Sequence, residues 1–267
     1  MHKRVLITGG ASGLGKALAL RWAQQGSNVC IADLNQERAE ETVQELQALN
    51  VDAFFVHCDI TDEASVESVK QAIVDKWQGI DLVVNNAGIA SADSLEDEDL
   101  VQWRTIMNVN LFGAVIVTRA FAPLMKAQNS GYFLNVASQA GITSIAMMAS
   151  YNVSKAAMIT FSETMRLELN DDNIGVSVLC PGFFKTNLKE SLRTKSDQLR
   201  SVLDKVMERA TITAEDVANY TFDAVSNKEL MIVTHPEGRT MYRLKRWFPK
   251  FYLKKMLEHT ARFRGRK

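Results

Sequence analysis

The feature that most constrains the fold of this chain is a regular alternation of short apolar runs with longer segments of helical period. Seven runs are rich in Val, Ile, Leu and Phe with little polar alternation, which is typical of parallel strands covered on both faces: 4–8, 28–32, 53–57, 81–85, 132–136, 175–179 and 230–234. Between them, apolar residues recur at helical spacing: 13–26, 36–49, 62–78, about 97–128 and 151–170. This order predicts an α/β fold: a Rossmann-like, doubly wound, mostly parallel seven-stranded sheet with helices on both faces.

The pattern runs through most of the 267 residues without a repeat, a low-complexity segment or a linker. Residues 187–228 are expected to form two further helices, with a substrate lid at about 187–212. We therefore predict a Rossmann-like catalytic domain over residues 1–238 and a separate C-terminal extension over residues 239–267.

Charge is unevenly distributed along the chain. The totals of 31 Lys+Arg and 31 Asp+Glu exclude a uniformly basic nucleic-acid-binding protein and a uniformly acidic one. From Arg239 to Lys267, however, eleven residues are basic and only Glu258 is acidic. This segment therefore carries +10, and the body before it carries −10.

The cysteine pattern and the absence of long apolar stretches bear on the compartment. Cys30, Cys58 and Cys180 lie far apart without a C-x-x-C pair, which favours reduced thiols over a disulfide framework or a thiolate metal site. The first predicted strand begins near the N-terminus, and no stretch approaches the ~20 apolar residues of a membrane-spanning helix. We expect a cytoplasmic protein, and the four scattered histidines suggest no metal site.

A glycine-rich turn, Thr8-Gly9-Gly10-Ala11-Ser12-Gly13-Leu14-Gly15, joins the first predicted strand to the first predicted helix. Glycines here permit a tight turn and close approach of the backbone to a pyrophosphate, while the helix N-terminus offers free N–H groups. Such a turn also suits an ordinary strand–helix connection. Its place in a strand–turn–helix unit favours a dinucleotide site, with these cofactor-binding residues: Gly9, Ser12, Gly13, Leu14 and Gly15.

Asp33 ends the second predicted strand, where an acidic residue can accept hydrogen bonds from the ribose hydroxyls of the adenosine. A 2′-phosphate would be repelled there, and neither Ser12 nor Leu34 supplies a compensating cation. NAD is therefore favoured over NADP. The alternative is that Asp33 only caps the helix that begins near Gln36.

Tyr151 and Lys155 are four residues apart in a predicted helix and so project from the same face. An ammonium near a phenol favours the phenolate, so we expect the pKa of Tyr151 to be lowered and the tyrosine to act as a general acid or base. Taken alone, the pair would also suit the exposed face of an amphipathic helix.

The whole set of motifs resembles the short-chain dehydrogenase/reductase family. The resemblance rests on the glycine turn, Asp33 and the following segments, in the family's order across roughly residues 3–235: Cys58-Asp59-Ile60, Asn85-Asn86-Ala87-Gly88, Asn108-Val109-Asn110, Ser138 within N-V-A-S, Tyr151 with Lys155, and Pro181-Gly182 followed by Thr186. It implies an NAD(P)-dependent alcohol dehydrogenase or ketone reductase.

The resemblance also implies a role for each matching residue. Tyr151 would exchange the proton, Lys155 would bind the nicotinamide ribose, Ser138 would hold the substrate oxygen, and Asn110 would interrupt its helix to hold a water that leads to Lys155. Asp59 and Ile60 would contact the adenine, Asn86 and Gly88 would border the ribose and nicotinamide, and Phe184 with Thr186 would close over the carboxamide. Ser138, Asn110, Asn85 and Asn86 also have simpler interpretations as a strand-end cap, a solvated helix residue and turn formers.

The segments expected to line the substrate cleft are apolar: Ile142, Ile145, Met147, Met148, Phe183 and Phe184, with Leu188, Leu192, Leu199, Val202, Leu203 and Val206 in the lid. We hypothesise a bulky apolar secondary alcohol or ketone, such as a lipid-like, steroid-like or aromatic one. The alternative is that these side chains pack the lid against the body.

The basic extension departs from the family pattern. Trp, Phe, Leu and Met alternate there with Lys and Arg, and Pro249 is expected to end one short helix and open another. Three interpretations are open: peripheral contact with an anionic membrane, packing on the body or on another subunit, and nucleic-acid binding, which is the least favoured.

Two functions follow as hypotheses. The first is an oxidoreductase that transfers a hydride between NAD(H) and a secondary alcohol or ketone, assembled as a homodimer or homotetramer as its relatives commonly are. The second is an NAD(P)-binding interaction protein recruited to a membrane or partner by its basic tail. The intact reactive set favours the first.

Overall fold

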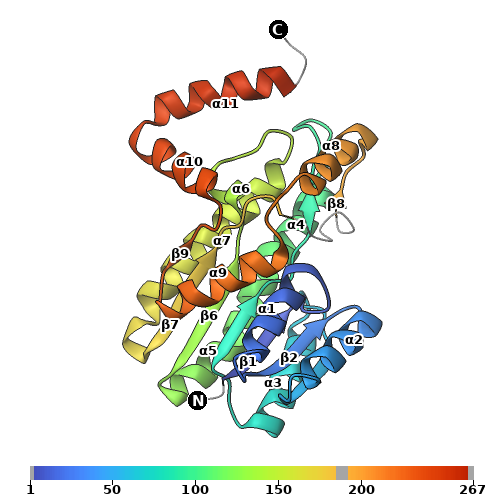
Figure 1. The fold of residues 1–267 in the computed structure, drawn as a ribbon, viewed down its shortest axis with the longest axis vertical. Helices are drawn as coiled ribbons and strands as arrows, with labels where there is room; N and C mark the ends of the chain where they lie inside the picture. Colours follow the sequence, from blue (N-terminus) through green and yellow to red (C-terminus); the bar gives the residue numbers. More distant parts are fainter. Residues whose placement is uncertain (1–2, 185–191, 264–267) are drawn as a thin grey trace.

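The computed structural model describes residues 3–184 and 192–263. Its main sheet has seven strands, each parallel to its neighbours, in the order β3-β2-β1-β4-β6-β7-β9 (Figure 1): β1 (Arg4–Thr8), β2 (Asn28–Asp33), β3 (Ala53–His57), β4 (Leu82–Asn85), β6 (Gly131–Val136), β7 (Ile174–Leu179) and β9 (Met231–Ile232). The predicted doubly wound sheet is confirmed. The last strand is shorter than expected because the chain turns at Thr234 and His235 into a helix.

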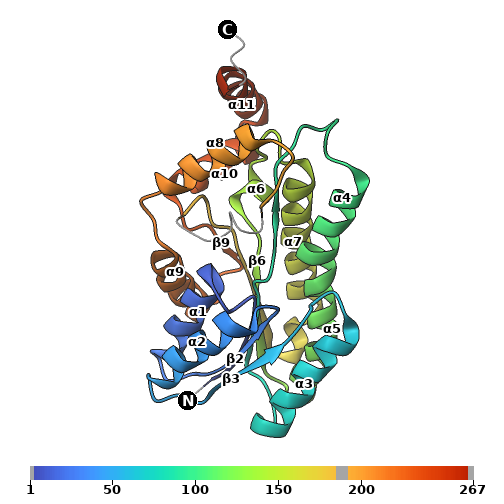
Figure 2. The ribbon, with the colours of Figure 1, turned by 90° about the vertical axis from the view of Figure 1, so that its right-hand side faces the viewer.

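Helices cover both faces of the sheet (Figure 2). One face carries α1 (Gly13–Ala23), α2 (Gln36–Gln47) and α9 (Ala214–Ser226). The other carries α3 (Glu63–Trp77), α5 (Gly113–Gln128) and α7 (Ala149–Glu168). Because both faces are covered, consecutive residues of β2 from Val29 to Ala32 are all buried, as the apolar runs predicted.

Polar residues at helix N-termini set several helix boundaries. Asn35 caps α2, Asp62 caps α3, and Thr213 forms a capping box with Asp216 at α9. These side chains satisfy backbone N–H groups that have no partner inside the helix.

The segment expected to be one helix over about 97–128 is divided. It consists of α4 (Leu100–Met107), a π-helical turn (η1, Asn108–Phe112) and α5. By length and mean hydropathy, Leu100–Gln128 could span a membrane, in contrast to the sequence expectation that no stretch is apolar enough. Phe121 and Met125 of this stretch are fully buried in the core beneath the sheet.

Most of the remaining elements gather near the carboxyl ends of the strands and at the C-terminus (Figure 1): β5 (Ala90–Ser91), α6 (Gln139–Ile142), β8 (Leu192–Arg193), α8 (Asp197–Glu208), α10 (Pro236–Trp247) and α11 (Pro249–Phe263). The short η2 (Asn170–Asp172) instead precedes β7. The short strands β5 and β8 pair in parallel as a second sheet. α8 and α9 are the two helices expected within 187–228, and Pro249 opens α11 as predicted.

Candidate functional site

A cleft of about 500 Å³ opens at the carboxyl ends of the strands, where the strand order reverses between β1 and β4. Ligands of doubly wound folds bind at this position. The cleft is lined by all the cofactor-binding residues predicted within the described part of the chain: Gly9, Ser12, Gly13, Leu14, Gly15, Asp33, Asp59, Ile60, Asn86, Gly88, Tyr151, Lys155 and Phe184. Thr186 lies outside the described residues, as does Leu188.

The glycine turn has the backbone geometry that its sequence predicts. Gly9 and Gly13 adopt φ angles of +64° and +54°, a region that favours glycine. A Cβ at Gly15 would lie 2.1 Å from the carbonyl oxygen of Gly9, so the helix could not begin this close to the strand with any side chain there. The N-terminus of α1 thus borders the cleft, a cradle that fits a pyrophosphate.

Asn86 holds this turn in place. Its side-chain amide donates hydrogen bonds to the carbonyl oxygens of Thr8 (3.0 Å) and Gly9 (2.9 Å). The neighbouring Asn85 is buried and donates to the Asn135 side chain at 2.8 Å. Both asparagines therefore connect strands or loops far apart in sequence, which is more than the turn-forming alternative requires.

Asp33 lies at the end of β2 and lines the cleft. Its carboxylate accepts hydrogen bonds from the backbone N–H groups of Ala11 (3.0 Å) and Asn35 (2.9 Å). The helix-capping alternative for Asp33 is wrong, because the α2 cap is the side chain of Asn35, which accepts from Arg38 N–H.

Asp59 and Ile60, which follow β3, also line the cleft. The Asp59 carboxylate accepts hydrogen bonds from the N–H (2.8 Å) and the hydroxyl (2.7 Å) of Thr61. Ile60 is buried, and its side chain occupies the space that a Cβ at Gly113 would need. Their positions suit the contacts implied by the family resemblance.

Tyr151 and Lys155 line the cleft, and Ser138 lies next to Tyr151. Tyr151 and Lys155 are on one face of α7, with the Lys155 Nζ atom 5.8 Å from the centre of the tyrosine ring. Lys155 donates a 3.0 Å hydrogen bond to the carbonyl oxygen of Val136, at the end of β6. Ser138 follows the same strand, and its hydroxyl hydrogen-bonds with the phenol.

The expected lowering of the Tyr151 pKa is not what the fold produces. Burial raises the pKa of the phenol above its ordinary value, and the hydrogen bond with Ser138 only partly opposes this. Burial also lowers the pKa of the Lys155 ammonium to about 8. Desolvation is the largest cause of both shifts, because both side chains are buried and Tyr151 packs against residues of β5, α6 and β8.

Asn110 lies in the π-helical turn, so it does interrupt its helix. Its side-chain amide pairs with the backbone of Ile89, accepting from the N–H at 2.8 Å and donating to the carbonyl at 2.9 Å, and it also donates to the Ser154 hydroxyl at 3.0 Å. It is buried, which excludes the solvated-helix alternative. Asn110 thereby connects the loop that contains Gly88 to the helix that carries Tyr151.

A smaller pocket of about 100 Å³ adjoins the first across Tyr151, Pro181 and Phe184. It is mostly apolar, and its lining is Ser138, Gln139, Ala140, Ile145, Met148, Tyr151, Pro181, Gly182, Phe183, Phe184 and Met207. Four of the predicted substrate-side residues are among them. Ile142, by contrast, is buried in the core near Tyr242, and Leu192 packs beside Ala90 in the small sheet.

His235 was not found by sequence reasoning, because it lies more than fifty residues from the segment it contacts. Its Nδ1 atom accepts a 3.0 Å hydrogen bond from Gly182 N–H, and its Nε2 atom is 3.0 Å from the carbonyl oxygen of Phe183. The ring thus holds the loop that lines both pockets. Arg193, which borders the cofactor cleft, was also missed.

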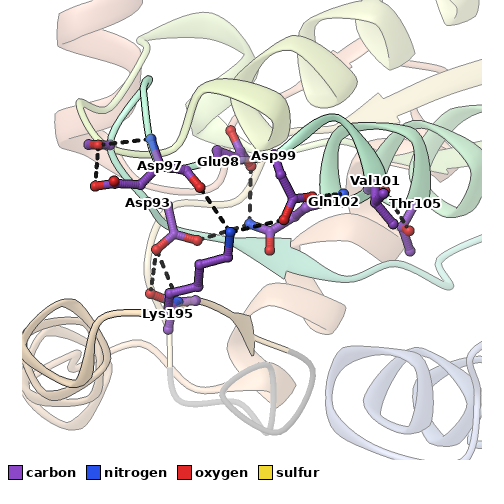
Figure 3. Close-up of polar contacts among 10 residues, drawn as sticks. Asp93, Asp97, Glu98, Asp99, Val101, Gln102, Thr105 and Lys195 are labelled. Carbon is purple, nitrogen blue, oxygen red and sulfur yellow. Dashed lines mark hydrogen bonds and ion pairs between the residues drawn. The ribbon is translucent and has the colours of Figure 1, made fainter.

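Polar contacts connect the segment between β8 and α8 to the loop between β5 and α4 (Figure 3). Asp93 is only 2% exposed, and its carboxylate accepts from the Thr194 hydroxyl at 3.2 Å and the Lys195 N–H at 3.0 Å. The Lys195 ammonium donates to the Asp97 carbonyl (3.1 Å) and to the Asp99 carboxylate (2.9 Å). Thr194 and Lys195, which precede α8, are therefore attached to the loop between β5 and α4.

Comparison with known proteins agrees with this geometry. A family model described as short chain dehydrogenase matches residues 3–197. The chain belongs to the short-chain dehydrogenase/reductase family. It has the Rossmann-type fold of that family.

Three members of the family illustrate the similarity. A structure from Burkholderia phymatum in complex with NAD is 29% identical with a TM-score of 0.88, covering 94% of this chain and 95% of that one. The protein named "Probable oxidoreductase EphD" of Mycobacterium tuberculosis is 30% identical over 97% of this chain, which spans 45% of the length of that relative. The 3-oxoacyl-[acyl-carrier-protein] reductase FabG of Thermotoga maritima is 37% identical over 73% of this chain and 79% of its own length.

Proposed function

We propose that this short-chain dehydrogenase/reductase transfers a hydride between NAD(H) and a secondary alcohol or ketone. The observation that carries the proposal is the position of Tyr151 and Ser138, which line the boundary between the cofactor cleft and an apolar pocket. A substrate in the smaller pocket would place its oxygen at these hydroxyls and its carbon toward the larger cleft. When bound, the nicotinamide supplies or accepts the hydride.

The residues of the chain would supply the proton chemistry. Tyr151, whose phenol is kept protonated by burial, would donate its proton to the oxygen of a ketone as negative charge develops, and would accept it back in alcohol oxidation. Ser138 would hold the same oxygen. Lys155 would bind the nicotinamide ribose, and Asn110 would keep the loop at Gly88 in place and support a water path to Lys155.

Asp33 supports NAD as the preferred cofactor. Its carboxylate lines the cleft, and its backbone partners hold it at the end of β2. A 2′-phosphate at this position would meet a like charge, and the exposed neighbour Leu34 offers no cation.

The apolar pocket supports a bulky apolar substrate. Ile145, Met148, Phe183 and Met207 leave few polar groups to bind a sugar or polyol, and methionine adapts to irregular apolar shapes. One relative is named as a reductase of 3-oxoacyl chains, which is consistent with reduction of a ketone on an apolar chain. A panel in which only sugars and small polyols react would contradict this part of the proposal.

We further propose that the enzyme forms a homodimer or homotetramer through the face of α4, α5 and α7. Large apolar side chains are exposed on this face: Leu100, Val101, Phe112, Val153 and Leu167. Burial of this face against a second copy would remove them from water. Light scattering of the full chain and of a Leu167→Glu variant would test it.

Replacement of Tyr151 by phenylalanine tests the catalytic assignment. We expect kcat to fall by on the order of 10²–10⁴-fold because the proton donor is lost. Binding of NADH, followed by its fluorescence, should be unchanged. Tyr132→Phe is the matched control, since Tyr132 hydrogen-bonds Ser177 outside the site. Unchanged turnover in Tyr151→Phe would refute the role of Tyr151 and favour an interaction protein.

A further inference from the structure

The C-terminal helix α11 extends away from the catalytic body. In Figures 1 and 2 it lies beyond the carboxyl ends of the strands, at the end of the molecule where α6 and α8 also lie. It packs against α10, with Tyr252 buried between the two. The basic extension is therefore divided into a helix that lies on the body and a helix that projects from it.

The docked helix α10 is attached to the wall of the substrate pocket. Its Arg239 guanidinium donates to the carbonyl oxygens of Val233 (2.9 Å) and Thr234 (3.3 Å). Lys245 donates to the carbonyl of Ile142 at 2.5 Å, and the carbonyl of Gly238 accepts from Gln139, which lines the pocket. α10 thus holds α11 in a fixed relation to the active-site end of the body.

The projecting part exposes large apolar side chains to water. Trp247 and Phe248, at the corner between the helices, are 72% and 64% exposed. Leu253 and Leu257, one turn apart on the same side of α11, are 56% and 61% exposed. Large apolar side chains that are this exposed to water indicate a surface that binds another molecule when the protein functions.

Cations lie beside these apolar side chains. Lys250 and Lys254 are one turn apart on α11, and both are exposed. Among the side chains that the structure describes, no Lys or Arg from Arg239 to Lys255 forms an ion pair with a carboxylate. The charge of these cations is therefore not paired at contact distance with a described carboxylate, and it is available to an outside anion.

We propose that α11 and the corner at Trp247–Phe248 bind the surface of an anionic lipid bilayer. The apolar side chains would enter the interface between headgroups and acyl chains, and Lys250, Lys254 and neighbouring cations would contact lipid phosphates. A lipid surface fits better than a second copy of the arm, since two arms of the same strong positive charge repel each other. The attachment of α10 to the pocket wall would then place the substrate pocket near the membrane, where an apolar substrate is concentrated; this last point rests on the proposed function.

Flotation of the full chain with lipid vesicles tests the proposal. Vesicles of phosphatidylcholine with roughly one third phosphatidylglycerol should carry the protein, and vesicles of phosphatidylcholine alone should carry much less. Leu253→Gln/Leu257→Gln removes the apolar contact, and Lys250→Glu/Lys254→Glu reverses the charge. We expect each removed cation to lower the partition coefficient by on the order of fivefold, and high salt to do the same.

The control variant carries the same types of change on the body, Leu49→Gln with Lys228→Glu, and should float like the unmodified chain. The proposal is overturned if no vesicle carries the protein or if both arm variants float unchanged. It is also overturned if the arm variants lose self-association by light scattering without any vesicle binding, since the arm would then contact a second copy. Turnover of a water-soluble ketone should persist in the arm variants, which keeps failure of this proposal distinct from failure of the catalytic one.

Discussion

The carboxylate of Glu98 accepts hydrogen bonds from both the backbone N–H and the hydroxyl of Ser150, the residue that precedes Tyr151. Glu98 is only 6% exposed, and Ser150 is completely buried. The Ser150 hydroxyl lies 2.7 Å from that of Ser91, in the small sheet that leads to the lid. A buried carboxylate thus fixes the N-terminal turn of the helix that carries Tyr151 and Lys155, where a negative charge is favoured by the helix dipole.

Replacement of Glu98 by alanine should destabilise the protein and misplace Tyr151. Loss of the acceptor leaves the buried Ser150 donors unsatisfied, which costs about 1–3 kcal/mol of the free energy of unfolding. Glu98→Gln retains one carbonyl acceptor and should recover part of both stability and kcat. Urea unfolding and steady-state kinetics measure the two effects. The exposed Glu96→Gln is the control, and a Glu98→Ala enzyme with unchanged kcat would show that this contact does not position the tyrosine.

Cofactor preference should change at Asp33. Asp33→Asn keeps a carbonyl acceptor for one of the backbone N–H groups but removes the charge. Because the ribose hydroxyls would no longer donate hydrogen bonds to a charged acceptor, we expect the Kd for NAD to rise by about 10–100-fold. Binding of NADP should improve, and more so when Leu34→Arg adds a cation at an exposed position. Fluorescence titration with NADH and NADPH measures the affinity of each variant for the two cofactors. If the double variant still preferred NAD, Asp33 would not be the residue that determines cofactor preference.

The buried ammonium of Lys155 should make stability depend on pH in a predictable direction. Its pKa is about 8 in the fold against an ordinary 10.5, so between these values the unfolded chain binds more protons than the folded one. The contribution of Lys155 to the free energy of unfolding therefore rises with pH across this window, and the cost of the buried charge is largest below pH 8.

The measurement is the difference in unfolding free energy between the unmodified chain and Lys155→Met, because other titrating groups cancel in the difference. From about pH 8 to 10.5, the free energy of unfolding of the unmodified chain should rise relative to that of Lys155→Met. A difference that is flat across this range would mean that the ammonium is not desolvated.

His235 should control the loop that separates the two pockets. His235→Ala leaves Gly182 N–H without its acceptor at a cost of about 1–3 kcal/mol. Because Phe183 and Phe184 follow directly, we expect KM for apolar ketones to rise. His235→Asn, whose side-chain oxygen can replace Nδ1, should restore part of the loss. Equal KM values in all three proteins would leave His235 a purely structural residue.

The local sequence was sufficient to predict the strands of the main sheet and to recognise the motif residues. The apolar runs located all seven strands of the sheet, since strands covered on both faces must be apolar throughout. The glycine turn was recognisable because its backbone conformations and close approaches tolerate no other residue. The helical repeat alone placed Tyr151 and Lys155 on one face.

Tertiary structure decided how the motif residues affect one another's pKa and which distant residues contact them. The pKa shift of Tyr151 has the opposite sign to the one that its spacing from Lys155 suggested, because desolvation depends on how many elements enclose the pair. Glu98 and His235 reach the site only through chain reversals of more than fifty residues, and neither lies in a periodic pattern that could identify it. In the basic extension, the sequence determined the mixture of basic and apolar residues and the boundary between two helices at Pro249. Only packing decided that α10 docks on the body while α11 projects with its apolar side chains exposed, because the body offers α10 backbone acceptors and a core contact.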